Sequence, residues 1–290
     1  MAPPPPASLP LVERLKLLAQ TLQFGWFVGH LTLILCVLRY GMSYIIFNYY
    51  STWAKGSYRL AFISAAATYG IVVYKGHLAR GLGGGNIPSI ALKLLADENV
   101  QYLGMALVWL FSRQVPLALL PFSIYSIFHV ATYSRTYLIP TLQPAKANGP
   151  PSPSSSSSRP AAKQSPLAER IGRFVKTYYD SSMGLVAGLE IMLLARVILG
   201  ALTFSKGSLF LLVVYSAFFR ARYAQSSFVQ QAISLGRARV DAAVSHQSTP
   251  PAVRQGWETF KGLAVKAYDM TDIRRYIGGA AQANGAKKPQ

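Results

Sequence analysis

Six strongly apolar stretches constrain the fold of this 290-residue chain more than any other feature of its sequence. Their lengths run from 12 to 20 residues, whereas a helix that crosses a bilayer needs about 20 apolar residues, with a range near 17–25. The stretches are residues 22–38, 60–74, 100–111, 115–131, 183–202 and 208–219. We therefore predict an all-α integral membrane protein with about six apolar helical segments, supplemented by cytosolic amphipathic helices.

Short connections pair several of these stretches. Only "SRQ" separates the third stretch from the fourth, and only "TFSKG" separates the fifth from the sixth. Because short connections join antiparallel neighbours, we expect the segments to form helical hairpins. Each hairpin either crosses the bilayer with help from flanking residues or sits as a wedge in one leaflet, and length alone does not distinguish these two arrangements.

The low charge density of the chain argues against a soluble bundle of helices. Only 13% of the residues are charged, whereas a soluble domain carries about 25%. The formal net charge is nevertheless +19, and such an excess suits an anionic membrane surface or a nucleic acid. Because the sequence has no dense Lys/Arg tract and no nucleic-acid-binding motif, we expect no nucleic-acid partner.

Five regions follow from these patterns. They are a cytosolic N-terminus with a short amphipathic helix (1–21), a front membrane module (22–139), a Ser/Pro-rich linker (140–166), a rear membrane module (167–222) that contains the hairpin 183–219, and a basic cytosolic tail with amphipathic helices (223–290). With an even number of crossings, 23 of the 29 Lys and Arg residues gather on the side of both termini. Since positive residues favour the cytosol, we predict that both termini are cytosolic.

The segment from Thr249 to Met270 has the spacing of an amphipathic helix. Its apolar stripe consists of Val253, Trp257, Phe260, Ala264 and Ala267, and its basic residues are Arg254, Lys261 and Lys266. We expect Thr249 to cap this helix and Pro250 to take the first helical position. The stripe contacts either anionic lipid or a partner helix, and we predict lipid because the sequence leaves little soluble core for the helix to join.

A second amphipathic segment precedes this one, over residues 228–244. Its apolar stripe includes Val229, Ile233 and Val240, and its polar side carries Arg237 and Arg239. Helices of this kind lie in the plane of a membrane and fill defects between the headgroups of curved bilayers. We predict that both segments bind curved, anionic membrane.

Glu190 is an acidic residue in the middle of the fifth apolar stretch. An ionisable group at such a position usually finds a partner or a wet cavity. Arg39, His30 and His129 are candidate partners from other stretches, whereas Arg196 lies six residues later and does not share the helix face of Glu190. Glu190 therefore either fixes helix packing or serves as an ion or proton site in a transporter or channel.

Two short motifs add to this picture. Gly184 and Gly188 form a Gly-x-x-x-Gly pattern on one helix face, which permits close helix approach. Lys287 and Lys288 stand at the fourth and third positions from the C-terminus. That spacing matches a dilysine signal for retrieval to the endoplasmic reticulum, or else an ordinary basic tail.

Motifs for catalysis and metal binding are missing from the sequence. Cys36 is the single cysteine, the four histidines are scattered, and no Gly-x-Ser-x-Gly elbow occurs. A membrane-embedded lipid enzyme is thus left without a nucleophile or a metal motif. We expect no enzymatic activity, no metal and no cofactor.

Two sequence segments resemble a known family. "SIFHVATYSR" (126–135) and "GSLFLLVVYSAFFRARYAQSS" (207–227) are similar to the transmembrane protein 33 family, known in fungi as pore-membrane protein 33. The resemblance runs from about Leu11 to about Val244. It is weakest in the Ser/Pro linker, whose length suggests a fungal member.

This resemblance implies a multi-pass protein of the endoplasmic reticulum and nuclear envelope with no catalytic residues to carry over. It implies membrane shaping together with reticulon-like proteins, a role in nuclear pore assembly or distribution, and contacts with nucleoporins and a nuclear-import receptor. The oligomeric state stays open. The expected function is a non-enzymatic organiser of curved membrane, and the alternative is a membrane transporter or channel that uses Glu190.

Overall fold

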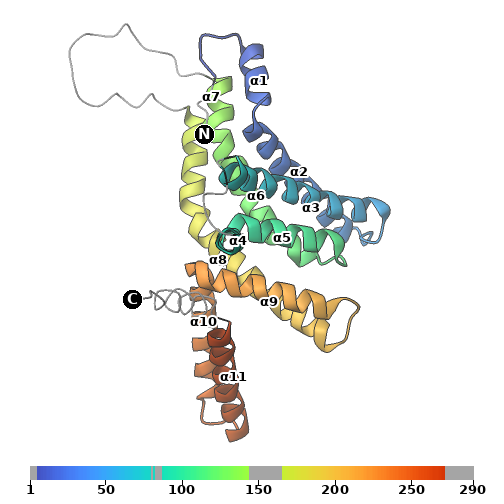
Figure 1. Ribbon diagram of the computed structural model, residues 1–290, viewed down its shortest axis with the longest axis vertical. Coiled ribbons are helices and arrows are strands. Elements are labelled where there is room, and N and C mark those ends of the chain that lie inside the picture. Colours follow the sequence, from blue (N-terminus) through green and yellow to red (C-terminus); the bar gives the residue numbers. More distant parts are fainter. Residues whose placement is uncertain (1–4, 80, 82–86, 144–164, 272–290) are drawn as a thin grey trace, which may run out of the picture. The chain divides into compact units, whose positions relative to one another are not determined.

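The computed structural model describes residues 5–79, 81, 87–143 and 165–271, and all regular structure in these ranges is helical (Figure 1). The chain divides into two compact units, Met1–Arg222 and Tyr223–Gln290. The prediction of an all-α chain is therefore confirmed for the described residues.

Each apolar stretch of the sequence lies within one of the long helices or extends it by a short helical turn. In chain order the helices are α1 (Leu11–Ala19), α2 (Leu22–Ile45), α3 (Thr52–Val73), α4 (Ile87–Leu95), α5 (Glu98–Phe111), α6 (Leu119–Tyr133), α7 (Ile139–Leu142), α8 (Pro166–Leu202), α9 (Ser208–Gln225), α10 (Ser227–Val244) and α11 (Pro251–Met270). Short π-helical turns, η1 (Tyr74–Leu78) and η3 (Ser134–Leu138), extend α3 and α6, and a 3-10 turn, η2 (Pro116–Ala118), precedes α6.

Polar side chains mark where the main helices begin. Thr21 accepts a hydrogen bond from the third residue beyond it, and so do Ser51 and Ser165. Asp97 accepts from the backbone N–H groups two and three residues on. Each such cap satisfies backbone donors that the first turn leaves free and contributes about 1 kcal/mol. These caps fix the starts of α2, α3, α8 and α5.

The first three packed helices of the first unit run alternately up and down. Tyr40 of α2 lies 5.3 Å from Tyr58 of α3 between ring centroids, whereas a Cβ built on Gly29 of α2 would meet Thr68 near the other end of α3. Tyr69 of α3 stacks on Tyr102 early in α5 at 5.4 Å. Arg59, near the start of α3, donates to carbonyls late in α5. These contacts make α2, α3 and α5 antiparallel neighbours.

The alternation continues through the remaining helices of this unit. Phe27 of α2 stacks on Tyr133 at the end of α6 at 4.6 Å. Phe128 of α6 lies 5.9 Å from Phe174, early in α8. Tyr215 of α9 donates a 3.0 Å hydrogen bond to the backbone oxygen of Glu190. The six long helices of the first unit therefore form antiparallel pairs, and helices from both sides of the 140–166 linker pack within this unit.

Three helical stretches in the described part of the chain are long and apolar enough to cross a membrane. They are Leu22–Ile45, Pro116–Leu142 and Pro166–Leu202. They contain the first, fourth and fifth apolar stretches of the sequence, and the other three stretches lie in α3, α5 and α9. Three crossings are thus supported by length and composition, and six remain a prediction.

The helix α8 is longer than the sequence pattern suggested. It has 37 residues and begins at Pro166 rather than near Met183, where the apolar stretch starts. Ser165 caps it, Pro166 takes its first turn, and no further proline interrupts it. At 1.5 Å per residue it is about 55 Å long, whereas a hydrocarbon core is about 30 Å thick. Its polar first half must therefore tilt or extend beyond that core.

Candidate functional site

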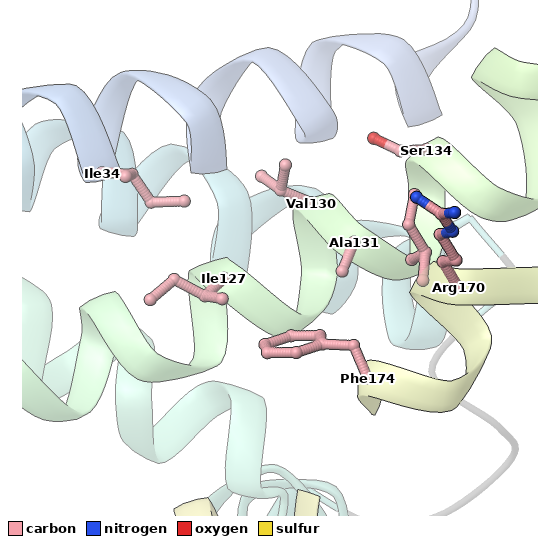
Figure 2. A pocket seen from close by; sticks show the side chains of 8 residues that line it. Ile34, Ile127, Val130, Ala131, Ser134, Arg170 and Phe174 are labelled. Atoms are coloured by element: carbon pink, nitrogen blue, oxygen red, sulfur yellow. The ribbon is translucent and has the colours of Figure 1, made fainter. Parts of the chain in front are cut away.

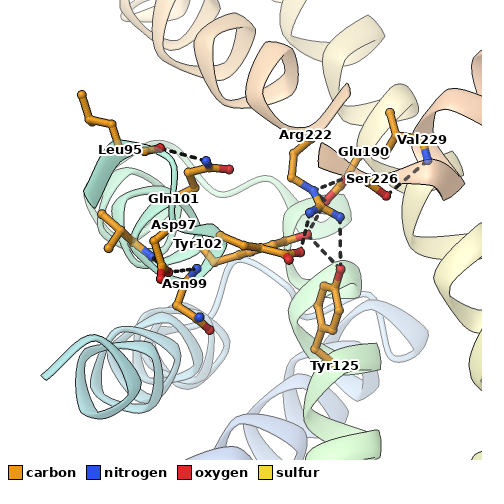
Figure 3. Close-up of polar contacts among 12 residues, drawn as sticks. Leu95, Asp97, Asn99, Gln101, Tyr102, Tyr125, Glu190, Arg222, Ser226 and Val229 are labelled. Carbon is orange, nitrogen blue, oxygen red and sulfur yellow. Dashed lines mark hydrogen bonds and ion pairs between the residues drawn. The ribbon is translucent and has the colours of Figure 1, made fainter. Parts of the chain in front are cut away.

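A buried ion pair joins α8 and α9 inside the first unit (Figure 3). The carboxylate of Glu190 accepts hydrogen bonds from Nε of Arg222 at 3.2 and 3.3 Å. Only 1% of the Glu190 side chain and 5% of the Arg222 side chain are exposed. Removing two charges from solvent is expensive, so the pair requires further hydrogen bonds to be stable.

Those further bonds come from α5 and α6. The hydroxyl of Tyr102 donates to Glu190 and lies 3.2 Å from the hydroxyl of Tyr125. Arg222 also donates to the carboxylate of Glu98 and, at 3.3 Å, to the hydroxyl of Tyr125. Its guanidinium carbon lies 5.2 Å from the centre of the Tyr102 ring. Five side chains from α5, α6, α8 and α9 thus form one polar cluster, which we call the Glu190 cluster.

The charged groups of the Glu190 cluster all have partners within the cluster. Both donor arms of Arg222 and the Glu190 carboxylate are engaged, and Glu98, whose side chain is 49% exposed, forms its rim. Such a cluster holds four helices in one register, because each partner would be left buried and unpaired without the others. Among the described residues, no three His, Cys, Asp or Glu side chains come together in a way that could hold a metal ion.

The partners of Glu190 differ from those expected from the sequence. Arg39 instead donates to Ser43 on its own helix at 2.6 Å. His30 bonds to Ser126 at 2.9 Å, and its ring lies 4.6 Å from that of His129. The histidines therefore hold α2 against α6. Sequence spacing cannot show which helices become neighbours, although Arg222, at the end of the last apolar stretch, was available as a basic partner.

The Gly184 and Gly188 pattern does not mediate close packing in the described part of the chain. A Cβ built on either glycine would meet no atom within 4 Å outside its own helix. The close approach of α2 and α3 occurs instead at Gly29, where such a Cβ would lie 2.5 Å from Cγ2 of Thr68. A contact of Gly184 and Gly188 with another molecule stays a prediction.

The second unit contains α10 and α11, which are held together by Asp241. Its carboxylate accepts from the indole N–H of Trp257 at 2.6 Å and from Nζ of Lys261 at 2.9 Å. Arg237, one turn earlier on α10, lies 3.6 Å from the same carboxylate. Asp241 is the only acidic residue of α10. Periodicity gave no indication of this role, although a lone acid in a basic helix is a signal for such a contact.

Electrostatics at Asp241 favour this contact at neutral pH. The hydrogen bond from Trp257 and then that from Lys261 hold the pKa of the Asp241 carboxyl below its ordinary value. Hydrogen bonds to Glu258 and Asp241 raise the pKa of the Lys261 ammonium. Both groups are therefore charged at pH 7, and the contact between α10 and α11 is ionic.

The apolar stripe of α11 is largely exposed. Val253 is 51% and Phe260 is 59% exposed, whereas Trp257 is partly buried and stacks on Phe260 at 5.5 Å. Lys266 is exposed, and Arg254 is exposed and donates to the His246 carbonyl at 2.9 Å. Trp257 and Lys261, predicted to contact lipid, are thus engaged with α10, whereas the other residues of the stripe are exposed.

The predicted stripe of α10 is less uniform. Val240 is 39% exposed and Arg239 is exposed, but Ile233 is partly buried. Val229 is fully buried, so it presents no surface to lipid, contrary to the prediction. Periodicity assigned Val229 to a face but could not show that the first turn of the helix is covered.

Two further expectations concern the ends of the tail. Thr249 does not cap α11, because its hydroxyl donates to the carbonyl of Ala243 at 3.2 Å. Pro250 takes the cap position, and Pro251 is the first helical residue. The proposed retrieval signal, Lys287 and Lys288, lies outside the described residues.

Comparisons with known proteins connect this architecture to a family. The family described as Transmembrane protein 33/Nucleoporin POM33 matches residues 8–268. The chain is 53% identical to "Nucleoporin POM33" of Chaetomium thermophilum over 282 residues, which cover 97% of this chain and 98% of that protein. It is 30% identical to "Tetra-spanning protein 1" of Schizosaccharomyces pombe over 264 residues, 89% and 88% of the two chains. It is 28% identical to "Pore membrane protein of 33 kDa" of Saccharomyces cerevisiae over 270 residues, 88% of each. No solved structure matches the chain.

Proposed function

This chain belongs to the Transmembrane protein 33/Nucleoporin POM33 family, and on that premise we propose that it is a non-enzymatic organiser of curved membrane at nuclear pores and in the endoplasmic reticulum. Relatives named for the pore membrane support the first location. The family resemblance of the sequence supports the second. In this proposal the helical hairpins anchor the protein, and the tail binds the curved surface.

The observation that carries the proposal is the exposed apolar stripe of α11. Val253 and Phe260 are each more than half exposed, and Lys266 is an exposed basic residue of the same helix. A helix of this kind lies in the headgroup region, and each basic residue near an anionic surface contributes about 1 kcal/mol. Apart from Trp257, which is bonded to Asp241, the stripe contains one Phe, one Val and two Ala residues, so binding is weak and favours membranes with packing defects.

The orientation of the protein is part of the proposal. The gathering of 23 of 29 basic residues on one side supports cytosolic termini. The antiparallel alternation of the six long helices is consistent with this arrangement, since an even number of crossings returns the chain to its starting side. Three crossings alone would place the termini on opposite sides, so the proposal requires that α3, α5 and α9 also enter the bilayer.

Partners are proposed by class. Anionic bilayer lipid is the partner that the basic tail supports directly. Nucleoporins, reticulon-like proteins and a nuclear-import receptor are partner classes suggested by the family. A transporter or channel is not favoured, because the Glu190 carboxylate is engaged by Arg222 and Tyr102.

Curvature sorting of the full chain tests the proposal. The labelled protein is reconstituted in giant vesicles that contain phosphatidylserine, and its density is compared between the flat membrane and a thin tube pulled from it. We expect enrichment on the tube, and a marked loss of that enrichment in a Val253→Asp, Phe260→Asp variant, because Asp removes apolar contact and repels anionic lipid.

The matched control is Val265→Asp. Val265 is also on α11 and is 56% exposed, but helical spacing places it about a third of a turn away from the stripe. If both variants keep the enrichment of the wild-type protein, the stripe does not bind curved membrane. A protein partner then becomes the better explanation for the exposed apolar residues of α11.

A further inference from the structure

An open apolar groove of about 470 Å³ lies between α2, α6 and α8 (Figure 2). Its walls are Ile34 of α2, Ile127, Val130 and Ala131 of α6, and Ile171 and Phe174 of α8, and it ends at Ser134 and Arg170. The volume lies within the range of about 300–1,000 Å³ that is typical of small-molecule sites. We propose that this groove binds one acyl chain of a membrane phospholipid, whose phosphate is held by Arg170.

The position of the groove selects lipid as the occupant. Within the described ranges, the stretches that contain α2, α6 and α8 are long and apolar enough to cross a membrane. Ile127 and Phe174 are 43% and 41% exposed, so their apolar surfaces are available to whatever surrounds the helices. The α8 residues of the groove belong to the polar first half of that helix, so the groove lies toward the headgroup end of the helices, beside the glycerol end of the acyl chains. An open apolar groove covers that part of a chain without leaving polar groups unpaired.

Charge is found at only one end of the groove. In Figure 2 the hydroxyl of Ser134 and the guanidinium of Arg170 lie together at one end, while Ile34 and Ile127 lie at the other. Arg170 is exposed and has no ion-pair partner among the residues that the structure describes. A guanidinium can bind a phosphate through two parallel hydrogen bonds. An apolar groove with one cation at its end is complementary to an acyl chain with one phosphate at its end.

The surroundings of Arg170 resemble the headgroup layer of a membrane. Tyr178 and Tyr179, two turns further along α8, are 53% and 45% exposed, and Arg173 and Lys176 lie between them and Arg170. Exposed aromatic and basic residues are enriched where membrane meets water. The groove runs within this layer along α6 from Ser134 to Ile127, a distance of about 10 Å at 1.5 Å per residue. That length accommodates the upper part of an acyl chain.

The test uses the purified full chain. The protein is reconstituted in nanodiscs of dioleoylphosphatidylcholine and dioleoylphosphatidylserine, transferred to a mild detergent, and examined by native mass spectrometry for lipid that stays bound. We expect a retained phospholipid, and about a tenfold lower retained fraction in Arg170→Gln, the effect of losing a charge-assisted hydrogen bond. Ala131→Trp fills the groove and should also abolish retention.

Two matched variants and one lipid serve as controls. Arg173→Gln removes a neighbouring exposed charge outside the groove, and Leu120→Trp adds an indole to an exposed position elsewhere on α6. Both should retain lipid as the wild-type protein does. Dioleoylglycerol has the same chains without a phosphate and should be lost from the wild-type protein.

Three results would overturn the assignment. Retention that is unchanged in both Arg170→Gln and Ala131→Trp would show that the bound lipid lies elsewhere. Retention of dioleoylglycerol equal to that of phospholipid would remove the role of Arg170. If the same variants leave lipid unchanged but convert a dimer to a monomer in light scattering, the groove is a contact between two copies of the chain.

Discussion

Substitution of Arg222 should destabilise the first unit more than substitution of its partner Glu190. In Arg222→Met the Glu190 carboxylate, 1% exposed, would keep only the hydrogen bond from Tyr102. Breaking a buried pair in this way costs about 3–5 kcal/mol. In Glu190→Gln, Arg222 retains Glu98 and Tyr125 as acceptors, and the amide oxygen still accepts from Tyr102. The expected loss is then about 1–3 kcal/mol.

The asymmetry can be measured on the full chain in detergent. Aliquots are heated, and the fraction that still elutes as a monodisperse peak is followed by fluorescence-detected size exclusion. About 2–4 °C per kcal/mol for a chain of roughly this size predicts that Arg222→Met lowers the midpoint by roughly 10 °C and Glu190→Gln by several degrees. The double substitution should cost less than the sum of the two, since they remove one shared interaction.

Lys206→Met is the control, because Lys206 is exposed in the turn between α8 and α9. It should leave the midpoint unchanged. An Arg222→Met protein as stable as the wild type, or a Glu190→Gln protein that is less stable than Arg222→Met, would contradict the role of the Glu190 cluster in holding the four helices in register.

Gly29→Ala should destabilise the α2–α3 pair by about 1–3 kcal/mol, because the new methyl would lie 2.5 Å from Cγ2 of Thr68. Adding Thr68→Ser to Gly29→Ala should restore the heat-stability midpoint. Gly25→Ala is the control and should not change the midpoint, because a Cβ at Gly25 meets nothing within 4 Å. Ser126→Ala should lower the same midpoint by removing the partner of the buried His30, at a cost of about 1–3 kcal/mol, and an unchanged midpoint would mean that water or another group replaces the hydroxyl. The contact at Asp241 should be fully present above the ordinary carboxyl pKa of 3.8, and it should weaken as pH falls through the lowered pKa of the folded protein. Hydrogen exchange of α11 should therefore rise steeply only in acid. Asp241→Asn should show faster exchange of α11 already at pH 7, and equal exchange in the two proteins would exclude the ionic contact.

Apolar stretch length was sufficient to predict the helical class and the six main helices of the first unit, because each stretch of 12 to 20 apolar residues became a helix or part of one. It was not sufficient for α8, whose first half is polar. That half is helical because Ser165 and Pro166 start it and because it packs on α6 through Phe128 and Phe174. Hydropathy identifies segments that are apolar along their whole length. It therefore misses a mostly polar helix that packs through a few side chains on one edge.

Of the residues in the Glu190 cluster, only Glu190 itself could be predicted from the sequence. Glu190 stood out because a carboxylate in an apolar stretch must be paired, but Tyr102, Tyr125 and Glu98 come from segments 65 to 92 residues away in sequence. Their convergence depends on the order in which the helices pack, which no local pattern contains. For Trp257, periodicity correctly predicted a position on the apolar stripe of α11. Its contact with Asp241 was missed, because counting the indole as apolar leaves out its N–H, which donates to that carboxylate.

The packing of α6 on α8 has a consequence for how the chain can be cut or lengthened. Residues 143 to 165 join α7, which follows α6 directly, to the start of α8. The aromatic stack of Phe128 with Phe174, and the contact of Arg135 with Gly172, hold α6 and its η3 extension beside α8 without that connection. Two polypeptides that end at Gln143 and begin at Ser165 should therefore find each other in one membrane and reassemble. The same argument makes this connection the natural place for a protease site or a fluorescent domain, and for lineages to differ in length while the helices stay in register.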